Sequence, residues 1–193
     1  TRPPPTTTLS RVRRQRQMCI RDRGSTVSLA KYVEVIYDPI TGNRYDNTGA
    51  AIAGADPKAI PGAVMMYVIG LANDSAALTA TNLSVEDNIP DGSPELVDEG
   101  NQSGAPSQIF LPTSVSFAVG AGTPAPFDLT GITDLNDVHA QDCTRSPIAD
   151  ANAEYAGGVV LGGDDSANPE FTVAIGNCDP GESAFLVYFV TVN

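Results

Sequence analysis

Beyond its first 24 residues, this sequence has very little positive charge. Seven of the eleven Lys and Arg residues lie in residues 1–24, together with only one of the 23 acidic residues. The remaining 169 residues therefore hold four basic and 22 acidic side chains, a net charge of −18. Nucleic acid requires a basic face on its partner, so this charge argues against nucleic-acid binding, and it disfavours an anionic membrane surface. Such acidity is typical of proteins that stay soluble outside the cell, of proteins that work in high salt, or of proteins that bind divalent cations.

Other absences limit the chemistry. No apolar run approaches the length of a membrane span, so no span is predicted. His139 is the only histidine, and without a G-x-S-x-G motif a nucleophile would lack its base. One histidine and two cysteines 35 residues apart also lack the close ligand pairs of a structural zinc site. We therefore predict a protein that is not an enzyme, with a glycosidase carboxylate pair among the acids as an open alternative.

The arginine-rich start, "RRQRQMCIRDR" at residues 13–23, has two interpretations. One is a basic arm for an acidic partner, whereas a secretory signal is excluded because no apolar run follows the charges. The other is that ten consecutive residues resemble the translation of an adaptor DNA used in sequencing libraries. We favour the second and treat residues 1–24 as a sequencing artefact that is expected to be disordered. The folded domain is then residues 25–193, and its natural N-terminus, with any signal peptide, is expected to be missing.

The cysteines indicate a compartment. With Cys19 in the arginine-rich segment, the domain keeps one pair, Cys143 and Cys178. An even pair in an acidic chain rich in Gly and Pro predicts a disulfide and an extracellular or cell-surface location. In the chain-entropy model, closing this loop contributes roughly 4 kcal/mol of stability. The alternative is a pair of reduced, buried thiols.

The periodicity of the sequence is that of strands. Seven segments are rich in Val, Ile, Phe and Tyr, and most of them alternate apolar with polar residues: 31–39, 63–73, 81–90, 114–120, 157–163, 170–176 and 183–193. Gly- and Pro-rich breakers lie between them, and a short helical turn is expected only near residues 132–141. The sequence predicts an all-β fold, an antiparallel sandwich of about seven or more strands.

Two parts of the chain resemble a known family. Residues 57–92 contain a set of matching positions, and the stretch "PGES" at 180–183 precedes the last strand; the matches are Pro61, Gly62, Tyr67, Ile69, Asn73, Asn82, Leu83, Asp87, Pro90 and Gly92. This pattern is similar to the conserved-repeat, Ig-like domains of bacterial and archaeal surface proteins. The resemblance covers about 57–92 and 170–193. It implies a secreted β-sandwich used as a building block, usually without catalytic activity, here with a long insertion at about 93–157.

Two kinds of site are candidates. Calcium prefers carboxylate oxygens in loops, although neither acidic segment fits a D-x-D-x-D-G loop and solvated turn acids are the alternative. The calcium candidates are Asp134, Asp137, Asp142, Asp164 and Asp165. Some surface Ig-like domains also join a Lys of the first strand to an Asn at the end of the last. Lys31 and Asn193 occupy such places, with Glu86 or Asp87 as the acid, and the alternative is that Lys31 only solubilises its strand.

Two predicted strands, 63–73 and 183–193, are apolar on both faces, so both faces must be covered. The second face carries the candidate interface residues Met66, Val68, Phe185, Val187 and Phe189. Either the insertion folds over this face, or another subunit covers it in a homo-oligomer or fibre, and edge strands could also accept a neighbour's strand. The functional prediction is a non-enzymatic extracellular structural or interaction protein, a subunit or module of a surface fibre, sheath or adhesin. A calcium-dependent ligand- or carbohydrate-binding module is the alternative.

Overall fold

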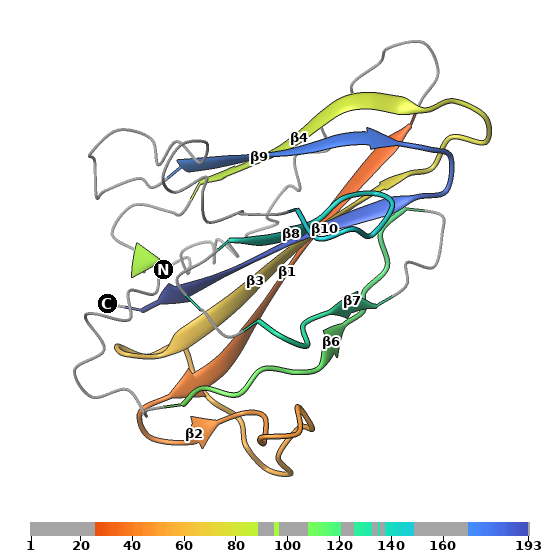
Figure 1. Cartoon of the computed structure of the whole chain (residues 1–193). Coiled ribbons are helices and arrows are strands. Elements are labelled where there is room, and N and C mark those ends of the chain that lie inside the picture. The colour runs from red at the N-terminus through yellow and green to blue at the C-terminus, as the bar shows by residue number, and fades with distance from the viewer. Residues whose placement is uncertain are drawn as a thin grey trace, which may run out of the picture.

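The computed structural model describes residues 26–88, 95–96, 108–120, 126–132, 135, 138–148 and 170–192. Within them every regular element is a strand, and every pairing is antiparallel (Figure 1). The strands are β1 (Val27–Asp38), β2 (Gly42–Asn43), β3 (Val64–Asn73), β4 (Ala80–Asn88), β5 (Glu95–Leu96), β6 (Ser114–Val115), β7 (Phe127–Asp128), β8 (His139–Gln141), β9 (Glu170–Cys178) and β10 (Ser183–Thr191). The prediction of an all-β, mostly antiparallel protein is confirmed.

The main sheet is built on three long strands. Its order is β2-β1-β3-β10-β5, and β8 also pairs with β10. Ile69, in the centre of β3, lies opposite Lys31 of β1 and Leu186 of β10. β3 and β10 are almost entirely buried, as expected for strands that carry apolar residues on both faces.

One face of the main sheet packs against the β4–β9 pair, which forms a separate layer beside it (Figure 1). Ile69 and Leu186 of the main sheet belong to the same buried cluster as Val85 of β4 and Val173 of β9. This face is opposite to the one that carries the candidate interface residues.

The other face is covered by residues 108–120 and 126–132 of the same chain. Met66, Val68, Phe185, Val187 and Phe189, the five candidate interface residues, are between 0% and 1% exposed. They form one cluster with side chains of the covering segment, among them Val115, Phe127 and Leu129. The cover is thus the intramolecular alternative, and burial within the chain removes these five side chains as a partner surface.

A glycine in the middle of β3 makes room for this cover. A Cβ on Gly70 would lie 2.6 Å from Cγ2 of Val119 and 2.8 Å from Cζ of Phe117. Phe117 in turn packs edge-on against Phe185, with 5.8 Å between the ring centroids. The lack of a side chain at residue 70 therefore lets the covering segment approach the sheet closely.

Five predicted strands correspond to long observed ones, but the covering segment differs from expectation. β6 spans only Ser114–Val115 of the predicted strand 114–120, and the short strands β2, β5, β7 and β8 were not predicted. Residues 139–141 of the expected helical turn form β8, where they pair with β10. The predicted strand 157–163 lies outside the described residues. No helix in the described part is long and apolar enough to cross a membrane.

Candidate functional site at the disulfide and the β1 edge

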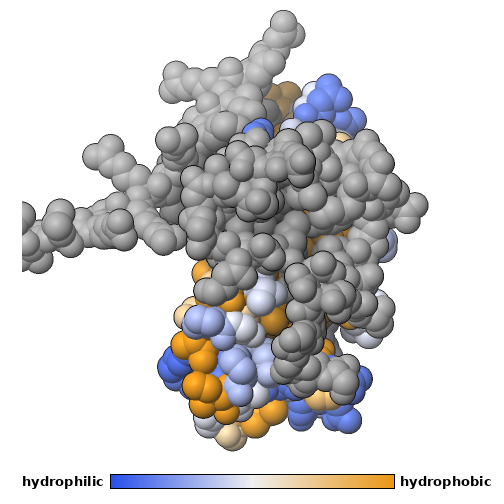
Figure 2. Space-filling view, turned by 90° about the vertical axis from the view of Figure 1, so that its left-hand side faces the viewer, coloured by the Kyte–Doolittle hydropathy of each residue, from blue (hydrophilic) through white to orange (hydrophobic). Residues whose placement is uncertain are grey.

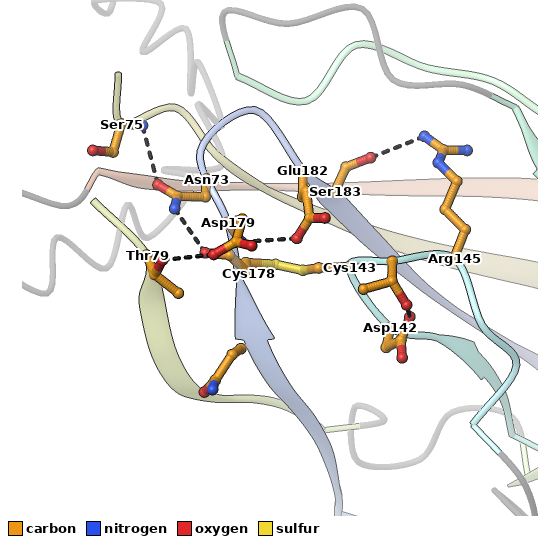
Figure 3. Close-up of a disulfide and its surroundings, with 12 residues drawn as sticks. Asn73, Ser75, Thr79, Asp142, Cys143, Arg145, Cys178, Asp179, Glu182 and Ser183 are labelled. Atoms are coloured by element: carbon orange, nitrogen blue, oxygen red, sulfur yellow. Dashed lines mark hydrogen bonds between the residues drawn. A yellow bond between two sulfur atoms is a disulfide. The ribbon is translucent and has the colours of Figure 1, made fainter. Parts of the chain in front are cut away.

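The disulfide lies at one end of the main sheet. Cys143 follows β8 and Cys178 ends β9, and the two are bonded with 5.1 Å between their Cα atoms (Figure 3). Both residues are buried, at 3% and 0% exposure. The predicted pairing of Cys143 with Cys178 is thus present, and it ties the segment that pairs with β10 to the β4–β9 layer.

Asn73 is the polar centre of this end. Its fully buried amide nitrogen donates to the carbonyl oxygens of Leu78, at 2.8 Å, and Cys178, at 2.9 Å. Its Oδ1 accepts a hydrogen bond from the backbone N–H of Ser75, at 3.0 Å (Figure 3). One side chain therefore joins the end of β3 to the end of β9. The sequence marked Asn73 only as a family match, and no local pattern predicted its contacts.

The turn between β9 and β10 is held by its own polar groups. Gly181 adopts a φ of 80°, which suits a glycine after Pro180. The backbone N–H of Asp179 donates to the Glu182 carboxylate at 2.8 Å, and the Thr79 hydroxyl donates to the Asp179 carboxylate at 2.6 Å (Figure 3). The "PGES" stretch is therefore a structured turn bound to the residue before β4.

The turn after β8 is docked onto β10 by Arg145. Its guanidinium donates to the buried Ser183 hydroxyl at 3.1 Å and lies 5.7 Å from the Phe185 ring centroid. Within the turn, Asp142 Oδ1 accepts from the Thr144 hydroxyl and the Ser146 N–H, both at 2.8 Å. Asp142, the described calcium candidate, thus acts as the acceptor that closes this turn.

The other four calcium candidates, Asp134, Asp137, Asp164 and Asp165, lie outside the described residues. Among the residues that are described, no three His, Cys, Asp or Glu side chains gather as a metal site. His139 lies on β8, where it pairs with Val187 of β10.

A second polar cluster joins the two layers. Lys31 of β1 forms an ion pair with Asp87 of β4, and Asp87 also accepts a hydrogen bond from the Tyr188 hydroxyl at 2.6 Å. The Lys31 ammonium lies 4.9 Å from the ring centroid of Tyr67 and 5.7 Å from that of Tyr188, and these two rings are stacked. The structure thus brings together Lys31 and Asp87 of the predicted crosslink, as an ion pair. Asn193 lies outside the described residues, and Glu86 is exposed.

A third cluster surrounds Glu34, on the opposite face of β1. Its carboxylate accepts hydrogen bonds from the hydroxyls of Tyr32, at 2.9 Å, and Tyr45, at 2.8 Å, and forms an ion pair with Arg44. Burial, reinforced by the hydrogen bond to Glu34, raises the pKa of each tyrosine to about 12. These contacts hold the loop after β2 against β1.

In the described part of the chain, the outer edge of β1 is unpaired over most of its length. Among the described strands, β2 pairs with β1 only at Tyr37 and Asp38. On the face that the β4–β9 layer covers only in part, Leu29 is 57% exposed and Val33 is 47% exposed. Figure 2 shows apolar residues between hydrophilic ones on the coloured lower part of the molecule, at the end where β2 lies in Figure 1. The edge of β1 is thus a candidate contact surface.

Comparison of the chain with protein-family models, with curated proteins and with solved structures finds no match. The Ig-like surface family therefore stays a prediction from the sequence.

Proposed function

We propose that this chain is a non-enzymatic, extracellular structural module, an Ig-like β-sandwich that serves as a subunit of a surface fibre, sheath or adhesin. The proposal rests on the hydrogen bonds that the buried polar side chains make. The polar residues that are buried as a whole in the described part are Asp38, Asn73 and Ser183, and each is hydrogen-bonded to a separate segment of the fold. Asp38, for example, ends β1 and accepts from the backbone N–H groups of Thr41, at 2.6 Å, and Lys58, at 2.7 Å.

Such contacts suit a structural module, which must keep its shape. Hydrogen bonds that link segments far apart in the sequence resist separation of the strands, because breaking one leaves a buried polar group without its partner. The buried disulfide adds a covalent joint between β8 and β9 and fits an oxidising compartment. The net charge of −18 over residues 25–193 keeps such a module soluble outside the cell.

The proposal is tested by multi-angle light scattering of the full chain over a wide concentration range, with negative-stain electron microscopy of the most concentrated samples. A structural subunit is expected to associate as concentration rises, starting from a 20.1 kDa monomer. A strict monomer at the highest soluble concentration would contradict the proposal. A saturable heat on calorimetric titration with calcium would favour the calcium-dependent binding module instead.

A further inference from the structure

We infer that the open edge of β1 is a self-association site, where β1 of a second copy of this chain adds as an antiparallel strand. This inference rests on the proposed structural role and specifies the surface that the role would use. The edge offers unpaired backbone groups along β1 before Ile36, among the described residues. Unpaired edges with exposed apolar side chains are the usual template for strand addition.

The distribution of charge selects a second copy as the partner. Residues 25–193 hold only four basic side chains, and three of them, Lys31, Arg44 and Lys58, lie on β1 or in the loops next to its end. Each forms an ion pair, with Asp87, Glu34 and Asp56 respectively. Over residues 29–35 of β1 the charged side chains are Lys31 and Glu34, both ion-paired, so this part of the edge is nearly neutral in a strongly acidic chain. Two like-charged copies can approach there with little repulsion, whereas a site for a cationic partner would expose unpaired acids.

The exposed apolar residues are also arranged symmetrically. Leu29 and Val33 lie two residues to either side of Lys31, on the same face of β1. A twofold axis at Lys31 places Leu29 of each copy opposite Val33 of the other. This is the self-complementary contact of an isologous dimer. On the other face, the small Ala30 meets the large Tyr32 of the second copy.

The two Lys31 residues meet at the axis, which would normally oppose pairing. Here each ammonium is turned toward its own chain, onto the Asp87 carboxylate and over the rings of Tyr67 and Tyr188. Its charge is therefore largely compensated before the strands meet. Because one short strand pairing buries less than the roughly 1,200 Å² of stable interfaces, we expect a weak, concentration-dependent dimer.

The register can be tested by disulfide trapping in the full chain, with Cys19→Ser as background to remove the free thiol. Leu29→Cys and Val33→Cys proteins, with tags of different mass, are mixed at high concentration under mild oxidation. In the proposed register the Cβ atoms of residue 29 in one copy and residue 33 in the other lie within roughly 5.5 Å of each other. The yield of mixed disulfides should therefore exceed that of a control pair at least about five-fold. Leu29→Cys alone should not dimerise, since its two copies lie about 13 Å apart along the strands.

The control pair combines Leu29→Cys with Thr172→Cys, at an exposed position of β9 in the other layer. A second experiment compares sedimentation of Leu29→Glu with Leu78→Glu, which changes an exposed apolar residue of the connection between β3 and β4. Leu29→Glu should weaken association several-fold and Leu78→Glu should leave it unchanged, with both variants folded by circular dichroism.

The outcomes separate this inference from the proposed function. Association with trapping no better than the control pair, or equal effects of the two Glu variants, overturns the β1 site and leaves the structural role standing. Trapping of Leu29→Cys with itself overturns the register and with it the symmetry argument. A chain that never associates overturns both proposals.

Discussion

Replacing Asn73 tests whether its buried hydrogen bonds stabilise the fold. Asn73→Ala removes three side-chain hydrogen bonds at a fully buried position and leaves the carbonyl oxygens of Leu78 and Cys178 without their donor. At about 0.5–1.5 kcal/mol for each bond, we expect a loss of about 2–4 kcal/mol in the free energy of unfolding. This would be a large fraction of the roughly 5–15 kcal/mol typical of a domain.

A second variant, Asn73→Asp, gives a more specific prediction. It keeps the acceptor for Ser75 but turns a carboxylate oxygen toward the two carbonyl oxygens, so it should be less stable than Asn73→Ala at neutral pH. Repulsion raises the pKa of the new carboxyl in the folded state above its unfolded value, so stability should recover as the pH falls and the group becomes protonated.

The assay is urea unfolding followed by circular dichroism, with Asn47→Ala at an exposed turn position as the control. The control should stay within about 0.5 kcal/mol of the parent protein. If Asn73→Ala were equally neutral, the hydrogen bonds of Asn73 would not hold this end of the fold, and the argument from buried polar groups would fail.

Three further predictions concern the disulfide, the covering segment and the tyrosines. Cys143→Ser should lower the unfolding free energy by roughly 4 kcal/mol, and intact mass of the parent protein should be two hydrogens below the fully reduced value; an unchanged mass on reduction contradicts the bond. Gly70→Ala should cost about 1–3 kcal/mol by overpacking against Phe117 in the same unfolding assay, and a neutral effect would mean that the segment is loosely placed. Tyr32 and Tyr45 should titrate near pH 12 by ultraviolet absorbance. Because their folded pKa values are raised, their contribution to stability is complete below about pH 10 and is lost as the pH rises through 12, and titration near 10 would refute the Glu34 cluster.

The long strands could be predicted from the sequence because their signal is local. The run 63–73 and the run 183–193 carry apolar residues at successive positions, and only strands covered on both faces tolerate this. The same property indicated that the second face needs a cover. The choice between an insertion and another subunit could not be made, since the described residues 108–120 and 126–132 contain only short strands whose burial depends on Gly70 and its neighbours.

Of the contacts in the candidate site, only the disulfide could be predicted from the sequence, because it follows from the number of cysteines. With two cysteines in the domain, one pairing was available, and Cys143 and Cys178 form it. The partners of Asn73 lie as many as 105 residues away, and no spacing rule connects them. Lys31 and Asp87 were named as members of one candidate crosslink site, but their contact depends on how the β4–β9 layer sits on β1, which strand patterns do not specify. Short β-strands such as β7 and β8 are likewise defined by their partners more than by their own residues.

The most direct test of self-association through β1 is hydrogen exchange of the full chain at low and at high concentration. The account predicts that peptides covering Leu29–Val35 gain protection as concentration rises, because their outward amides become paired, while peptides from β9 exchange at an unchanged rate. Equal exchange of Leu29–Val35 at both concentrations, in samples that light scattering shows to be associated, would contradict it.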